Sequence, residues 1–171
     1  MFQKFTHRIY SLMMIGACLS MVTAFLTIGL GVIAREAAWN IQGLDAYAGY
    51  SIAAALFLAL PGTFKRGEHI RVTLLIQKMS PRVQRWLEYW CLSVGALLSL
   101  YVAAFAVRIV WVSYATHDVS QGADATPLWV PQIFMAIGCV GFALSVIDAL
   151  WAHVTEQPFF EATADGAARV E

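Results

Sequence analysis

The chain has 171 residues, of which 60% are hydrophobic and only 13% are charged, and its formal net charge is zero. Soluble globular domains carry about 25% charged residues, so this composition excludes a water-soluble domain, and the absence of a net basic charge gives no reason to expect nucleic acid as a partner. The mean hydropathy of +0.66 and the grouping of charges between long apolar runs indicate an integral membrane protein of one compact domain.

Four uncharged stretches are long enough to cross a bilayer as helices, which takes about 20 apolar residues. They are Tyr10–Ala34, Ala46–Phe64, Tyr89–Val107 and Ala125–Ile147. With their flanks they predict membrane spans at 10–34, 46–64, 86–107 and 127–149. All six tryptophans lie at or near the ends of these spans, as expected of an indole that prefers the headgroup region. The predicted fold is an all-α, four-span membrane domain over residues 1–153.

The length of the first apolar run distinguishes a cleaved signal peptide from an uncleaved membrane anchor. It is longer than the roughly 7–15 residues of a signal-peptide core, so we expect an uncleaved anchor.

Of the eleven Lys and Arg residues, nine lie before the first span, between spans two and three, or in the tail, and two lie in the other loops. The positive-inside rule then predicts cytoplasmic N- and C-termini, with residues 154–171 as a disordered cytoplasmic tail.

The residue pattern between spans two and three predicts an amphipathic helix at about residues 68–79. Val72, Leu75, Ile76 and Met79 repeat at helical spacing, and basic residues flank this apolar face. We interpret it as an interfacial helix in contact with anionic membrane lipid. The alternative is a soluble amphipathic hairpin packed on the cytoplasmic face of a partner. Ser80-Pro81 then predicts the start of the next helix.

No pattern in the chain indicates catalytic chemistry. Phosphate-binding loops and hydrolase motifs are absent, Cys18, Cys91 and Cys139 each stand alone in an apolar run, and the four histidines lie at or beyond predicted span ends. We therefore expect no enzyme activity, no cofactor and no metal site.

The four predicted membrane-crossing stretches carry no charged group that would mark a solute pathway, which argues against an autonomous transporter. Small-residue pairs four apart predict helix packing at Gly49/Ala53, Ser99/Ala103 and Gly141/Ser145.

Three short segments resemble one transporter family. After the second span, Arg66-Gly67 and His69-Ile70-x-Val72 resemble the inner-loop signature of the small membrane subunit of TRAP transporters, the tripartite ATP-independent periplasmic carriers. Residues 45–50 and 127–132 resemble the family's outer starts of spans two and four. The similarity covers about residues 8–152. One departure is Ala46, where the family often has an acidic residue, and this weakens an ion pair at that position.

The resemblance implies a division of labour among three components. A large permease subunit binds sodium and substrate, and a periplasmic solute-binding protein delivers an organic acid anion. The small subunit would scaffold the large one in a heteromeric symporter, as a multi-pass protein of the bacterial inner membrane. The alternative function is a small anchor subunit of a redox or lipid-modifying enzyme complex, although a haem anchor would need histidine within a span.

The same resemblance gives candidate structural and partner-contact residues. Arg66, Gly67 and His69 would fix the turn into the surface helix, or simply anchor the chain at the membrane edge. Trp129, Pro131 and Gln132 would shape the outer start of span four, near the binding protein. Arg35 and Asp45, with Glu36, would present charge to that partner, unless they are only solvated.

Overall fold

The structure, a computed structural model, describes residues 2–66, 80–122 and 124–155. Within these ranges the chain folds into four α-helices: α1 (Phe2–Glu36), α2 (Leu44–Lys65), α4 (Pro81–Ala115) and α5 (Trp129–Val154). Each is long and apolar enough to cross a membrane. The prediction of an all-α fold with four such helices is therefore confirmed. The predicted interfacial helix at 68–79 lies outside the described residues.

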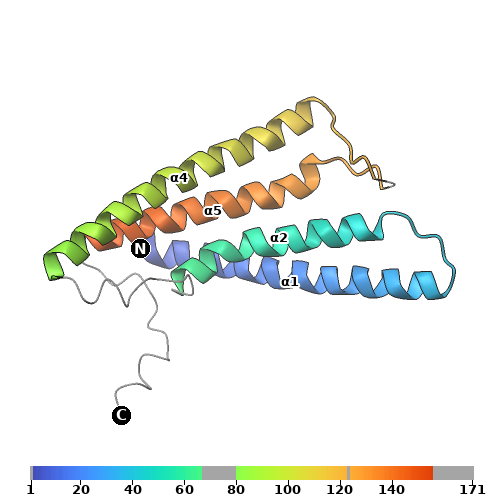
Figure 1. The fold of residues 1–171 in the computed structure, drawn as a ribbon, viewed down its shortest axis with the longest axis horizontal. Coiled ribbons are helices and arrows are strands. Elements are labelled where there is room, and N and C mark those ends of the chain that lie inside the picture. The colour runs from blue at the N-terminus through green and yellow to red at the C-terminus, as the bar shows by residue number, and fades with distance from the viewer. Residues whose placement is uncertain (1, 67–79, 123, 156–171) are drawn as a thin grey trace, which may run out of the picture.

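The helices are arranged as a row with α2 and α5 in the centre (Figure 1). Helix α1 packs on α2, α2 packs on α5, and α5 packs on α4. Because consecutive helices run in opposite directions, the start of α1 and the end of α5 lie at one end of the bundle. The loops 37–43 and 116–128 lie together at the other end, which we call the outer end.

Helix α5 is the most buried of the four described helices. In the most apolar stretch of 18 residues in α5, 44% is buried, compared with 22–28% in the corresponding stretches of the other three helices. One face carries Gly138 and Gly141, where an added Cβ would lie 2.5 Å from the Phe57 carbonyl oxygen and 3.0 Å from Pro61 Cγ. Small side chains thus let the α2 and α5 backbones approach closely.

A second face of α5 packs on α4. Ala136, Cys139 and Ala143 of α5 form a buried cluster with Ala103 and Ala106 of α4. The predicted packing pairs Ser99/Ala103 and Gly141/Ser145 are buried. The third pair, Gly49/Ala53, is exposed and packs against no other described helix, because α1 and α5 both contact other faces of α2.

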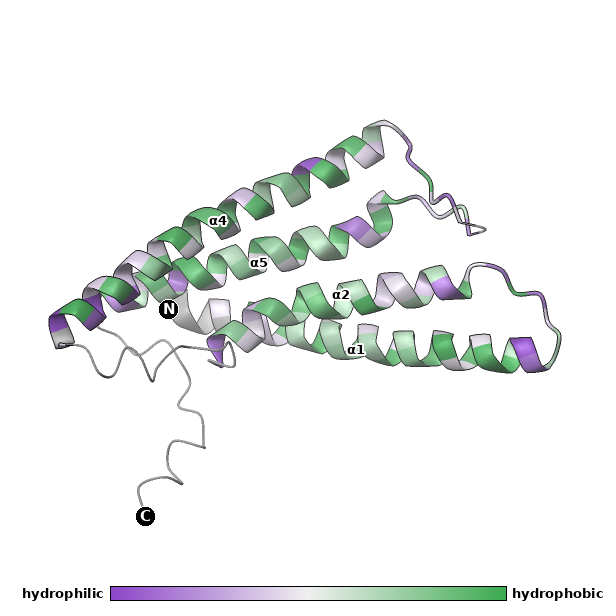
Figure 2. Ribbon diagram, viewed as in Figure 1, coloured by the Kyte–Doolittle hydropathy of each residue, from purple (hydrophilic) through white to green (hydrophobic). Residues whose placement is uncertain are grey.

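The hydropathy of the ribbons matches a membrane-embedded bundle (Figure 2). Apolar residues occupy the middle of all four helices, and most hydrophilic residues lie toward their ends. Helices α1 and α4 leave many large apolar side chains exposed, among them Phe25 and Leu97. In water such a surface would be unfavourable, whereas lipid or a membrane partner covers it without cost.

Candidate functional site

The two outer loops meet in a polar contact centred on Asp124, and this contact joins the α1–α2 hairpin to the α4–α5 hairpin. Ser120 Oγ donates a hydrogen bond to Asp124 Oδ1 at 2.9 Å, and Tyr50 Oη of α2 donates to Oδ2 at 3.2 Å. Next to it, Thr126 Oγ1 donates to Tyr47 Oη at 3.3 Å. A single carboxylate therefore binds groups from its own loop and from α2.

The electrostatics of this contact favour the ionised carboxylate. Hydrogen bonds from Thr126 and Ser120 hold the pKa of Asp124 below its ordinary value of 3.8, against a smaller opposing effect of burial. The loop is also closed by backbone hydrogen bonds, from Ser120 N to Thr126 O at 2.8 Å and from Leu128 N to Asp118 O at 3.0 Å. These hydrogen bonds cross-link the described residues of the loop at the outer end.

Gly43 allows the two loops to approach each other. It precedes α2 with a φ of 86°, in the left-handed region that disfavours side chains. A Cβ at this position would lie 2.8 Å from the Cβ of Asp124. Both the backbone conformation and the available space therefore require glycine here.

Two of the predicted partner-contact residues lie beside this site. Arg35 Nη2 lies 3.6 Å from Asp45 Oδ1, which joins the end of α1 to the first turn of α2. Both side chains are highly exposed, at 75% and 95%, so the pair contributes little to stability. Exposed charges of this kind remain available to a partner.

Trp129, Pro131 and Gln132 all lie in the first turn of α5, at the same outer end. The Trp129 ring packs edge-to-face on Tyr114 of α4, with ring centroids 5.7 Å apart. Pro131 is compatible with the first helical turn, where its missing N–H costs nothing. Gln132 Oε1 is buried, and no hydrogen-bond donor reaches it within the described part of the chain.

Of the inner-loop candidates, Arg66 lies at the opposite end of the bundle. Arg66 caps the C-terminus of α2 through its backbone N–H, which donates to Gly62 O at 3.1 Å, and its side chain is exposed. Gly67 and His69 lie outside the described residues. Among the described candidates, Arg66 therefore lies at one end of the bundle and the others lie at the other end.

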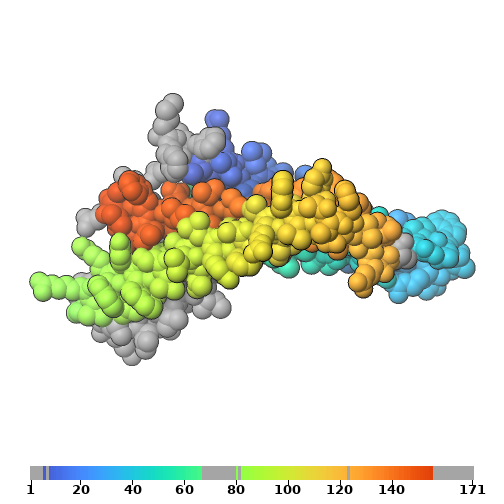
Figure 3. Space-filling model, turned by 90° about the horizontal axis from the view of Figure 1, so that it is seen from above, coloured from blue at the N-terminus to red at the C-terminus, as the bar shows by residue number. Residues whose placement is uncertain are grey.

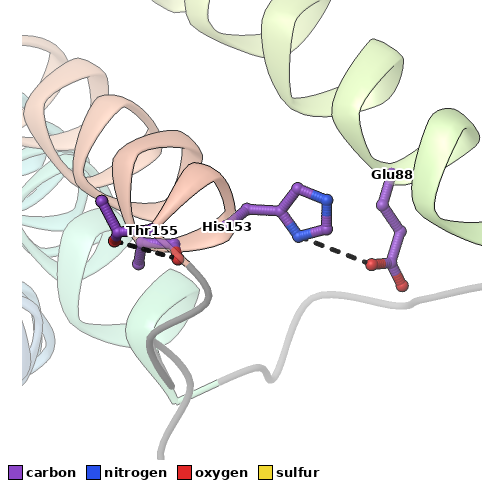
Figure 4. A network of polar contacts seen from close by, with 4 residues as sticks. Glu88, His153 and Thr155 are labelled. Carbon is purple, nitrogen blue, oxygen red and sulfur yellow. Dashed lines mark hydrogen bonds and ion pairs between the residues drawn. The ribbon is translucent and has the colours of Figure 1, made fainter.

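Sequence reasoning missed two polar contacts at the inner end. His153 of α5 points toward α4, where its Nδ1 lies 3.7 Å from Glu88 Oε2 (Figure 4). Thr6 Oγ1 of α1 donates to Asp148 Oδ2 of α5 at 3.4 Å. Helix α5 extends beyond the uncharged stretch that ends at Ile147, so Asp148 and His153 are part of the helix. The signal available in sequence was an Asp and a His five residues apart at the end of a predicted span.

These contacts join helices to one another rather than assembling reactive groups. Among the described residues, no three His, Cys, Asp or Glu side chains gather in a way that could hold a metal ion. The outer site is a hydrogen-bonded surface with exposed charge, which suits contact with another protein.

Comparison with known proteins gives one family match. The model of the family described as tripartite ATP-independent periplasmic transporters, DctQ component, matches residues 24–156. This range includes α2, α4 and α5 and more than half of the chain. Searches of curated proteins and of solved structures found no match.

Proposed function

The chain belongs to the DctQ family, the small permease components of TRAP transporters, and on that premise we propose that it scaffolds a large permease subunit during sodium-coupled uptake of an organic acid anion. Members of this family are transporter components and not enzymes, and they work with a large permease and a periplasmic binding protein. The protein is accordingly a multi-pass protein of the inner membrane.

The observation that carries the scaffolding proposal is the row of helices. Because only α2 and α5 are central, α1 and α4 each contact the bundle along one side and leave the rest of their surface uncovered. Exposed side chains such as Phe25 of α1 and Tyr101 of α4 give a partner helix a long apolar surface to pack against. A row of helices offers more such surface than a closed four-helix bundle of the same length.

The placement of charge supports the same division of labour. The middle of each helix is uncharged, and the carboxylates of Asp148 and Glu88 lie toward the inner end, where each contacts a side chain of another helix. Substrate and ion pathways need polar groups deep in the membrane. We therefore infer that sodium and substrate cross through the large permease.

The outer end supports a role in docking the binding protein. Arg35, Glu36 and Asp45 are exposed there, next to the loop held by Asp124. A surface held in one conformation loses little entropy when a partner binds. This role also requires the outer end to be periplasmic and both termini to be cytoplasmic.

Co-purification and transport assays test this function. The chain should purify from membranes with a much larger multi-span permease in equal amounts, and uptake into proteoliposomes should require both membrane subunits and the binding protein. A stable homo-oligomer without such a partner, or solute flux through the chain alone, would contradict the proposal. The alternative of an anchor for a redox or lipid-modifying enzyme is disfavoured by the family membership.

A further inference from the structure

Helix α4 carries one charged residue, Arg108, between the exposed aromatic side chains of its two ends. These side chains are Trp86, Tyr89 and Trp90 at the inner end, and Trp111 and Tyr114 at the outer end. Such rings prefer the headgroup region, so the residues between them are expected in the apolar layer. Of residues 91–110, only Arg108 is charged. A charged group at this position in a membrane helix is costly, and such groups usually pair with another protein group.

Arg108 faces away from its own bundle. Its side chain is exposed, whereas Ala103 and Ala106 are buried on the face of α4 that packs on α5. With 3.6 residues per turn, Arg108 lies on the opposite side of the helix from both alanines. Figure 3 shows α4, coloured green to yellow, at the surface of the molecule along its length. The described helices of the chain therefore leave the Arg108 side chain uncovered.

The Arg108 side chain is directed toward the middle of α4 and not toward the outer end. Cα–Cβ bonds tilt toward the N-terminus of a helix, which for α4 is the inner end (Figure 1). Arg108 Cζ lies 5.9 Å from the ring centroid of Phe105, about one turn closer to the inner end. The Phe105 ring in turn packs on Tyr101, with ring centroids 4.6 Å apart. The guanidinium is thus directed away from the level of Trp111, where lipid headgroups are expected.

No carboxylate among the described residues pairs with Arg108. Ion pairs between described residues lie elsewhere, at Arg35–Asp45 and at Glu88–His153. Asp118, the next carboxylate along the chain, accepts a hydrogen bond from Ser113, which is buried. The Phe105 ring attracts the guanidinium but does not neutralise its charge. In the part of the chain that the structure describes, this positive charge is uncompensated.

A shallow apolar groove lies on α4 next to this charge, toward the middle of the helix. It is lined by Leu97, Leu98, Leu100 and Tyr101, and only apolar atoms are exposed in it. Leu97, Tyr101 and Arg108 follow one another at spacings of four and seven residues, which places them on one face of α4. A helix that packs along the groove therefore brings its own side chains close to Arg108.

We propose that this face of α4 docks a membrane-spanning helix of the large permease, and that Arg108 pairs there with a carboxylate of that helix. The inference rests on the scaffolding function and specifies the helix and the charge through which the two subunits meet. A carboxylate on a neighbouring helix can lie at the level of the guanidinium, whereas lipid phosphates stay in the headgroup layer. Guanidinium and carboxylate form two parallel hydrogen bonds, and their attraction is stronger in apolar surroundings than in water.

The affinity between the two purified membrane subunits tests the pair. In nanodiscs, Arg108→Gln should bind the large permease at least about 30-fold more weakly than the unmodified chain, because the permease carboxylate is left unpaired. Arg108→Lys keeps the charge and should lose less affinity. The Tm of the isolated Arg108→Gln chain should not fall, since the side chain contacts no other described helix.

A matched control is Arg82→Gln, which removes the same charge from an exposed position at the inner end of the same helix. It should bind the permease as tightly as the unmodified chain. Equal affinities of Arg108→Gln and Arg82→Gln would overturn the proposal.

Charge reversal identifies the partner residue. Arg108→Glu should abolish binding, because two carboxylates then face each other in an apolar interface. Replacement of one membrane-embedded Asp or Glu of the permease by Arg should restore it. If none of these replacements restores binding, Arg108 has no carboxylate partner in the permease.

Cross-linking locates the interface while Arg108 stays in place. With the three native cysteines replaced by serine, Ala104→Cys, exposed beside Arg108, carries a photoreactive maleimide and should cross-link to the permease. Leu19→Cys, exposed on α1 at the opposite edge of the row, should not. If the subunits bind but Ala104→Cys gives no cross-link, the docking face is refuted while the scaffolding function stands. If the unmodified chain does not bind the permease, the scaffolding function itself fails.

Discussion

At the scale of single residues, the outer site depends on Asp124 and Gly43, which come from different hairpins. Asp124 accepts hydrogen bonds from its own loop and from Tyr50 of α2, and Gly43 lets the α1–α2 loop lie against it. Neither role is visible in local sequence, because each depends on a residue about 80 positions away in the chain. Both roles can be tested by substitution.

Replacing Asp124 should destabilise the protein in a pH-dependent way. Hydrogen bonds lower the pKa of Asp124 below 3.8 in the folded state, so its ionised form stabilises the fold at pH values above 3.8. As the pH falls through the lowered pKa, Asp124 becomes protonated in both the folded and the unfolded state, and this stabilisation is lost. Asp124→Ala should therefore lower the Tm in detergent at neutral pH, and the difference from the unmodified chain should shrink below pH 3.8. Asp45→Ala, in the exposed pair with Arg35, should change the Tm little, and a similar loss in both variants would argue against the special role of Asp124.

Replacing Gly43 should destabilise the protein through its backbone. A side chain in the left-handed region costs about 1–2 kcal/mol, and the contact with the Cβ of Asp124 adds to this cost. We expect Gly43→Ala to lower the free energy of unfolding by at least about 1 kcal/mol. Gly49→Ala is the matched control, because its Cβ meets nothing within 4 Å and alanine favours a helix. Equal stability of the two variants, measured by chemical unfolding in mixed micelles, would refute this account of Gly43.

At the scale of elements, α5 organises the bundle because two of its faces are lined by small residues. Gly138 and Gly141 allow contact with α2, and Ala136, Cys139 and Ala143 pack on α4. In lipid, helices associate by close packing rather than by a hydrophobic driving force, so such faces determine which helices pair. The polar contacts of α5 with Thr6 and Glu88 then link its inner end to α1 and α4.

Enlarging Gly138 should separate α2 from α5. Its new Cβ would lie 2.5 Å from the backbone oxygen of Phe57, which cannot move aside as a flexible side chain can. We expect Gly138→Ala to destabilise the fold by about 1–3 kcal/mol, a typical cost of overpacking. Gly29→Ala, where nothing lies within 4 Å, should leave stability nearly unchanged. Unfolding curves in detergent would compare the two, and an unaffected Gly138→Ala variant would mean that the α2–α5 interface can relax.

At the scale of the whole molecule, the two ends of the bundle differ in charge. The described inner end holds Arg8, Lys65, Arg66, Arg82 and Arg85, whereas the outer loops 37–43 and 116–128 contain two carboxylates, Asp118 and Asp124, and no Lys or Arg in their sequence. The positive-inside rule then predicts that the start of α1 and the end of α5 lie in the cytoplasm. This predicted orientation would put the outer site where a periplasmic protein can reach it.

Thiol labelling tests this orientation. With the three native cysteines replaced by serine, single cysteines at Asn40, Ser80 and Gln121 are exposed to a membrane-impermeant maleimide in intact cells from which the outer membrane has been removed. Positions 40 and 121 should react at once, and position 80 should react only after permeabilisation. Immediate labelling at position 80 would invert the topology and remove the outer site from the periplasm.

The sequence by itself determined the number of spans, the class of fold and the family. These depend on additive local properties: uninterrupted apolar length, tryptophan at the span ends, and short motifs such as Arg66-Gly67 and His69-Ile70. Sequence reasoning also indicated Arg35, Asp45 and the start of α5 as features of one outer surface, because loop order alone places them there.

Only the tertiary structure decided which helices are central and which residues hold the loops together. Hydropathy does not distinguish a helix face that meets lipid from one that meets another helix, since both are apolar, so the exposure of Gly49 and the burial of Gly141 could not be separated in advance. The contact of Asp124 with Tyr50 and that of Asp148 with Thr6 depend on distances between segments far apart in the chain. Such distances are fixed by the packing of α5 against its neighbours.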